Sequence, residues 1–165
     1  MSTPLQRRHA LGAEVEVAFA TLAGESWVAH RAGELGDGSV VLRREERADG
    51  SVVVAVSREL PSGVPGFLQR FLPADGRVQQ TETWAPSGDD GVRRGTWQVE
   101  VAGAPAEMGG TMRLEPDGSG CAYVIEGTVT VRLPLVGGKA ESFLVDMVQQ
   151  LSDKEATILR AALAE

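Results

Sequence analysis

The stretch that decides the fold is residues 139–164 (KAESFLVDMVQQLSDKEATILRAALA). Its large apolar side chains recur every three or four residues, the spacing that places side chains on one face of an α-helix. They are Phe143, Leu144, Met147, Val148, Leu151, Ile158, Leu159 and Leu163. The pattern predicts a long amphipathic helix whose apolar face needs a partner. Residues 152–155 (SDKE) have the spacing of a capping box, so we expect the helix to kink or restart there.

Upstream of this helix, the chain consists mainly of stretches that are typical of β-strands. In the first stretch, Val15, Val17 and Phe19 alternate with charged or small residues, as in a half-buried strand. Turn residues such as Asp49 and Gly50 separate later stretches, and short connections make neighbouring strands antiparallel. The expected strands are residues 12–23, 40–47, 51–60, 77–85, 92–102, 106–115 and 120–133.

Two short helices are expected between these strands, at residues 25–35 (ESWVAHRAGEL) and within the proline-bounded residues 61–73. The element order therefore predicts an α+β fold, in which a curved seven-stranded antiparallel sheet wraps around the long C-terminal helix. At this length we expect a single domain, residues 12–165, preceded by a flexible N-terminal segment, residues 1–11.

The alternation of side chains along the strands predicts which of them face the helix. Three glycines fall on the inner face: Gly95, Gly110 and Gly127. They indicate either strong curvature of the sheet or space for a cavity between sheet and helix. The candidate lining of that cavity is Trp97, Met112, Tyr123, Phe143 and Met147. The alternative is that these side chains fill a closed core.

The strand expected at residues 77–85 has no properly apolar face, because Gln80 and Glu82 lie on the same side as Val78 and Trp84. Either this strand is exposed, or Gln80 and Glu82 project into a wet cavity. A buried carboxylate would need a partner or a raised pKa. On the second interpretation, Glu82 and Trp84 join the candidate ligand-binding residues.

The composition excludes several classes of partner. The net charge is −7 and the basic residues are scattered, which disfavours nucleic acid, since phosphate binding needs clustered positive charge. No stretch approaches the roughly 20 apolar residues that span a bilayer, so integral membrane association is not expected. Cys121 is the single cysteine, which indicates a reducing, cytoplasmic location. Monomer and homodimer both stay open.

No catalytic machinery or cofactor site is apparent. His9 and His30 have no neighbouring ligands at metal-binding spacing, and both are expected to be solvated or packing residues. Sequence signatures for metal hydrolysis, serine hydrolysis or nucleotide binding are absent. We therefore expect no metal, no cofactor and no assignable catalytic residue, although the lack of a motif does not exclude catalysis.

The order of elements resembles the START (polyketide cyclase and lipid-transport, SRPBCC) superfamily with its helix-grip fold. Residues 131–141 (VRLPLVGGKAE), together with residues 80–84 (QTETW) and 103–105 (GAP), are similar to an uncharacterised actinobacterial family within it. The resemblance implies a ligand cavity between sheet and helix, but it carries over no catalytic residue. Fold alone is a weak guide to function.

Three hypotheses about function follow. The first is a non-enzymatic binding module for a small hydrophobic or amphipathic ligand, lipid-like or polyketide-like, held between sheet and helix. The second is a cyclase or dehydratase that uses Tyr123 or Glu82 for proton transfer, which requires Glu82 to face inward. The third is a protein-interaction module, for which an exposed apolar patch around Phe67 and Phe71 would be the sign.

Overall fold

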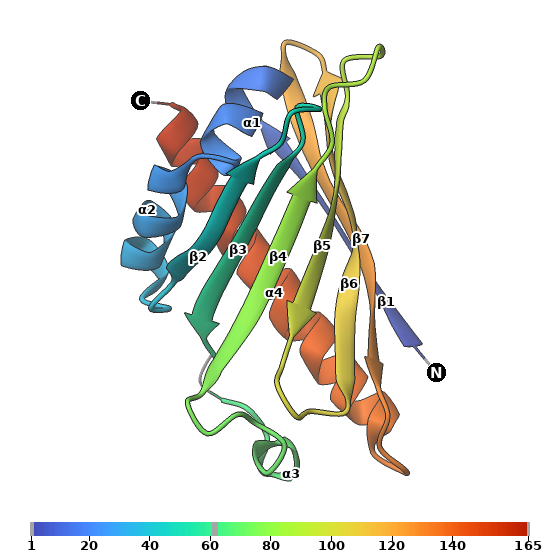
Figure 1. Ribbon diagram of the computed structural model, residues 1–165. Helices are drawn as coiled ribbons and strands as arrows, with labels where there is room; N and C mark the ends of the chain where they lie inside the picture. The colour runs from blue at the N-terminus through green and yellow to red at the C-terminus, as the bar shows by residue number, and fades with distance from the viewer. Residues whose placement is uncertain (1, 61–62, 165) are drawn as a thin grey trace.

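The computed structural model describes residues 2–60 and 63–164 (Figure 1). Within them, seven strands form one antiparallel sheet in the order β1-β7-β6-β5-β4-β3-β2. In chain order the elements are β1 (Ser2–Leu11), α1 (Val15–Leu22), α2 (Glu25–Leu35), β2 (Val40–Glu46), β3 (Val52–Glu59), α3 (Gly66–Gln69), β4 (Arg77–Trp84), β5 (Arg93–Glu100), β6 (Ala106–Asp117), β7 (Gly120–Val131) and α4 (Gly137–Leu163).

The long helix α4 crosses one face of the twisted sheet, as the sequence predicts (Figure 1). It packs against β1 and β7 at one side of the sheet. At the other side, α2 lies beside β2 and contacts α4, whereas α1 packs against β6, β7 and α4. α3 lies at the opposite end of the sheet from α1. The core is the layer between the sheet and α4.

The N-terminal prediction is wrong in two respects. Ser2–Leu11 is not a flexible segment but strand β1, paired with β7 along its whole length. Residues 12–23 are not a strand but contain helix α1, which buries Val15, Ala18 and Leu22 at helical spacing. Val17, which the strand pattern places inward, is 53% exposed. The total of seven strands is confirmed because β1 takes the place of the strand expected at residues 12–23.

Polar residues explain why β1 does not look like a buried strand. Its inward side chains include Thr3, Arg7 and His9, each of which meets a polar partner on α4. Thr3 donates a hydrogen bond to Glu141, and Arg7 forms an ion pair with Asp153.

α4 continues without interruption through the expected break at residues 152–155. Ser152 does not cap a helix start, because its hydroxyl is hydrogen-bonded to His9. Glu155 turns inward to two arginines, Arg31 and Arg58, and its charge is therefore balanced inside the protein. Of the two short helices, the first is confirmed as α2, and the second is a single turn, α3.

The predicted inward faces of β5, β6 and β7 are confirmed. The inward glycines, however, do not mainly create a cavity. A Cβ on Gly127 would lie 2.6 Å from Cζ2 of Trp97. A Cβ on Gly95 would meet Cε of Met112 at 2.9 Å and Cε3 of Trp84 at 3.1 Å. These glycines let two indoles and a methionine lie close to the sheet backbone.

Candidate functional site

Two small cavities of about 60 Å³ each lie between the sheet and α4. The first, here called the polar cavity, is lined by Arg58, Gln80, Glu82, Trp97, Val99, Met112, Tyr123, Ile125, Val148, Leu151, Ser152 and Glu155. The second, the apolar cavity, is lined by Leu60, Val64, Leu68, Phe71, Leu72, Val101, Ala104, Pro105, Ala106, Met108, Val131, Leu133, Leu144 and Met147. The two lie next to each other along the same interface, since Val99 and Val148 line the first, and Val101 and Met147 line the second.

Strand β4 supplies the acid of the polar cavity. Gln80 and Glu82 point inward, so the interpretation of this strand as an exposed one is wrong. Gln80 donates a hydrogen bond of 2.9 Å from Nε2 to Oε1 of Glu82. Removal of the Glu82 carboxyl from water raises its pKa; Glu155 adds to this rise, while Arg31 and Arg58 oppose it. Burial therefore favours the neutral carboxylic acid.

Three charged side chains from three elements meet at the same end of the cavity. Oε1 of Glu155 on α4 forms ion pairs with both guanidinium groups: Nη1 of Arg58 lies 3.2 Å away and donates a hydrogen bond, and Nη1 of Arg31 lies 3.5 Å away. Arg58 comes from β3 and Arg31 from α2, where only 5% of its side chain is exposed. Arg31 also donates to the hydroxyl of Ser39 at 3.2 Å.

Tyr123 of β7 brings a second ionisable group into the polar cavity. Its hydroxyl has only a weak acceptor, Sδ of Met112 at 3.9 Å, among the described residues. Burial, with Glu82 and Glu155 adding to it, raises the pKa of Tyr123 well above its usual value. The phenol therefore stays neutral and can donate a hydrogen bond into the cavity.

Ser152 of α4 lines the polar cavity, and His9 of β1 contacts Ser152. Nε2 of His9 lies 2.9 Å from Oγ of Ser152. Burial lowers the pKa of His9, and this outweighs the opposite effect of Asp153. His9 is therefore a buried neutral imidazole. Of the two roles expected for it, packing is confirmed and solvation is wrong.

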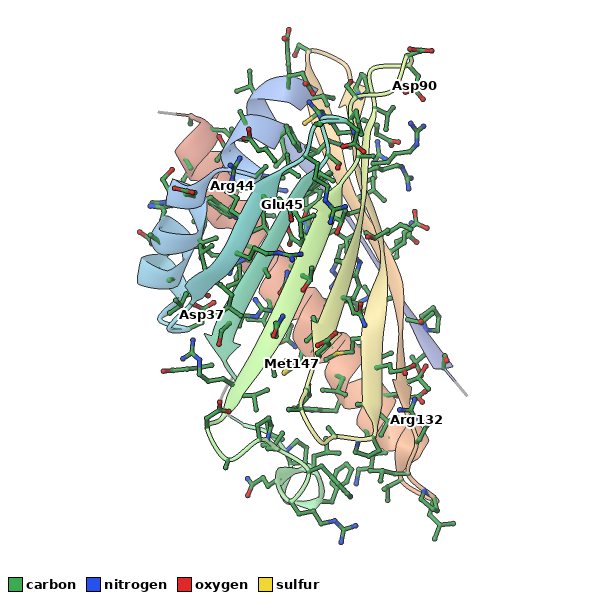
Figure 2. All side chains as sticks on the ribbon, in the orientation of Figure 1. Asp37, Arg44, Glu45, Asp90, Arg132 and Met147 are labelled. Atoms are coloured by element: carbon green, nitrogen blue, oxygen red, sulfur yellow. The ribbon has the colours of Figure 1, made fainter. Side chains whose placement is uncertain are left out.

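The sequence predicts part of this site. Glu82, Trp97, Met112 and Tyr123 all line the polar cavity. Met147 lines the apolar cavity instead, and Figure 2 labels it where α4 passes behind the lower part of the sheet.

Two other predicted residues line neither cavity. Trp84 is fully buried and packs edge-on against Phe19 at 5.6 Å between ring centroids. Phe143 is half-buried against the core.

Sequence reasoning missed Arg31, Arg58, Ser152 and Glu155. Arg58 lies on the same face of β3 as Val52, Val54 and Val56, so the alternation of side chains could have predicted that it points inward. Nothing in the local sequence of α2 or α4 indicates that Arg31 and Glu155 meet.

Two further properties bear on possible functions. Across residues 2–60 and 63–164, no three His, Cys, Asp or Glu side chains gather in a way that could hold a metal ion. Over the same residues, no helix has the length and apolar character needed to cross a membrane.

The chain is similar to proteins of unassigned activity. The model of a family described as a protein of unknown function, DUF2505, matches residues 6–163. Uncharacterised proteins of Mycobacterium tuberculosis and Mycobacterium bovis are 31% identical to the chain over 94 residues, which is 53% of this chain and 51% of theirs. The match thus spans about half the length of these relatives.

Solved structures share the helix-grip fold. The Zhui aromatase/cyclase from Streptomyces sp. R1128 has a TM-score of 0.64 at 12% identity, over 99% of this chain and 94% of that one. Norcoclaurine synthase from Thalictrum flavum, in complex with dopamine and hydroxybenzaldehyde, has a TM-score of 0.60 at 12% identity, over 100% and 88%. Protein Ms6760 from Mycobacterium smegmatis has a TM-score of 0.61 at 12% identity, over 98% and 90%. At these identities the likeness concerns the fold alone.

Proposed function

The chain belongs to DUF2505, a family of proteins of unknown function, and we propose that it is a non-enzymatic binding protein for a small amphipathic ligand, held between the sheet and α4. The observation that carries the proposal is the pairing of two adjacent cavities of opposite character. One presents Arg58, Gln80, Glu82 and Tyr123, whereas apolar residues alone line the other. A ligand with one polar and one apolar end matches this arrangement.

The cavities must widen to hold such a ligand. A volume of 60 Å³ has room for about four water molecules, whereas pockets for small organic ligands measure about 300–1,000 Å³. Met112 lines the polar cavity, and Met108 and Met147 line the apolar one. Methionine side chains are unbranched and adapt their shape readily, so they are the groups we expect to move when a ligand enters.

A ligand panel tests this function. Medium-chain acids, alcohols and aromatic compounds are added to the purified protein, and the midpoint of thermal unfolding is compared with native mass spectra. Binding predicts a higher midpoint and a 1:1 complex for at least one amphiphile. If no compound gives either signal, the proposal is wrong.

A matched pair of variants locates the binding. Ala106→Phe places a ring in the apolar cavity, which Ala106 lines, and should abolish binding. Ala161→Phe adds the same ring on the exposed side of α4 and should leave binding intact. Equal binding by both variants would exclude the apolar cavity as the site.

A second candidate function is proton-transfer catalysis on the bound ligand. Its supporting observation is that Glu82 faces inward and shares the polar cavity with Tyr123. A neutral carboxylic acid beside a neutral phenol can polarise a carbonyl oxygen. Recovery of the ligand chemically unchanged after long incubation with the protein would favour the binding role.

The protein-interaction hypothesis has less support. Phe71 lines the apolar cavity, and Phe67 packs against the core with Nζ of Lys139 5.4 Å from its ring centre. These aromatics close the α3 end of the interface. We further propose a cytoplasmic location, since Cys121 is a buried free thiol. Monomer and homodimer are both compatible with the described surface.

A further inference from the structure

The charges around the polar cavity do not balance when Glu82 is neutral. Arg31 and Arg58 contribute two positive charges, and among the described residues the ion pairs of both are made to one carboxylate, Glu155. Glu82 is the remaining acid in the lining. When Glu82 is neutral, the form that burial favours, Glu155 is the single carboxylate of the lining that pairs with the two guanidinium groups.

A buried charge without a full counterion is unfavourable, and either of two changes would relieve this imbalance. Glu82 can ionise, against the cost of its own desolvation. Alternatively, an anion can enter the cavity and lie beside Arg58, which lines it directly.

The geometry points to an amphipathic monoanion, a carboxylate with an apolar tail, as the ligand of this protein. This inference rests on the proposed binding function and names its ligand class. The carboxylate lies beside Arg58, and the tail follows β5 from Val99 towards Val101 and the apolar cavity. A guanidinium binds a carboxylate through two parallel hydrogen bonds, and a single negative charge matches the single uncompensated positive one.

Binding of the anionic ligand is then coupled to the uptake of a proton by Glu82. A ligand carboxylate and an ionised Glu82 would repel each other in a cavity this small, so the ligand favours the protonated acid. The groups that face Glu82 come from five elements: Arg31 of α2, Arg58 of β3, Gln80 of β4, Tyr123 of β7 and Glu155 of α4. At a pH above the Glu82 pKa of the empty protein, each ligand bound takes up one proton.

Octanoate and octan-1-ol make a suitable pair of probes, because they share an alkyl chain and differ in charge. We expect octanoate to bind at least tenfold more tightly than octanol at pH 6. Above the pKa of Glu82, its affinity should fall up to tenfold per pH unit. Octanol affinity should not change with pH. Calorimetry measures both, as does the intrinsic tryptophan fluorescence, to which Trp97 in the lining of the polar cavity contributes.

Three variants and one control, Arg132→Gln, test the assignment of charges. Arg58→Gln should lower octanoate affinity at least tenfold and leave octanol affinity unchanged, whereas Arg132→Gln, at an exposed ion pair, should alter neither. Glu82→Gln should keep octanoate affinity and remove its dependence on pH. Glu155→Gln leaves both arginines without their carboxylate, so it should bind octanoate more tightly than the wild type, an effect that a damaged fold would not produce.

The possible outcomes separate the two proposals. If octanol binds as well as octanoate and Arg58→Gln has no effect on either, the inference of an anionic ligand is wrong while the binding function stands. If Glu155→Gln weakens octanoate binding in a folded protein, the charge argument is likewise overturned. If neither probe nor any other amphiphile binds, both the proposed binding function and the inference of an anionic ligand are wrong.

Discussion

Nε2 of His9 on β1 and Oγ of Ser152 on α4 lie 2.9 Å apart, although 143 residues separate them in the chain. Their contact is buried and ties the edge strand of the sheet to the middle of the long helix. A buried histidine that stays neutral makes stability depend on pH, and the first prediction follows from this.

The contribution of His9 to stability should decrease as the pH falls below about 6.5, the usual pKa of a histidine in an unfolded chain. Burial lowers the pKa of His9 in the folded state, so below pH 6.5 the unfolded chain takes up a proton that the folded one does not. Urea unfolding at pH 5.0 and 7.5 measures the loss. His9→Gln should reduce this dependence on pH, while His30→Gln, on the exposed side of α2, should retain it. Identical pH profiles for the two variants would contradict the prediction.

Glu82→Gln should stabilise the protein at pH 8 and have little effect at pH 4. The pKa of Glu82 is raised in the folded state, so its favourable contribution is complete below about pH 4.5 and is lost as the pH rises through the folded value. The expected gain is about 1–3 kcal/mol, the range for a buried polar group without full compensation. Chemical denaturation at both pH values measures it. Glu107→Gln, on the exposed surface, should show no such gain.

Gly127→Ala should destabilise the protein by about 1–3 kcal/mol, the usual cost of overpacking. The added Cβ would lie 2.6 Å from Cζ2 of Trp97 and 2.5 Å from the carbonyl oxygen of Gly109. A shifted emission of Trp97 should accompany the loss. Gly138→Ala on α4 provides the control, because a Cβ there would have no atom within 4 Å and alanine favours a helix. Equal stability of the two variants would show that the indole of Trp97 does not pack directly against Gly127.

Leu5→Ala should cost about 2–5 kcal/mol if β1 is part of the core. Leu5 is 4% exposed, whereas its neighbour Gln6 points to solvent. Gln6→Ala should therefore change the free energy of unfolding by less than about 0.5 kcal/mol. Denaturant unfolding of both variants shows whether residues 2–11 form a buried strand or the flexible segment expected from the sequence. A small effect of Leu5→Ala would favour the flexible segment.

The parts of the fold that could be predicted are those in which apolar spacing alone determines the burial. α4 and strands β5 to β7 belong to this group, and the inward faces of these three strands follow from simple alternation. β1 could not be predicted in this way, because Thr3, Arg7 and His9 are satisfied by residues of α4 more than 130 positions away. In α1, Val15 and Phe19 fit both a strand and a helix, and only the exposure of Val17 distinguishes them.

The same difference applies to the site. Its apolar and aromatic lining follows from strand parity, so Trp97, Met112 and Tyr123 could be found from the sequence. The charged end could not. Arg31, Arg58 and Glu155 come from three elements, and each resembles an ordinary surface residue until the fold brings them together. Glu82 could be identified as a candidate from the sequence, but its inward orientation could not, because it depended on whether β4 was exposed.

The position of α4 in the chain has a consequence for synthesis. Strands β2 to β7 leave the ribosome before α4, which covers their inner face in the finished protein. Until Leu163 has emerged, the valines of β3 and the indole of Trp97 have no helix to pack against. Nascent chains with apolar strands in this state are prone to aggregate and are substrates for chaperones. Truncations that remove α4 should therefore yield chains that associate with chaperones or precipitate.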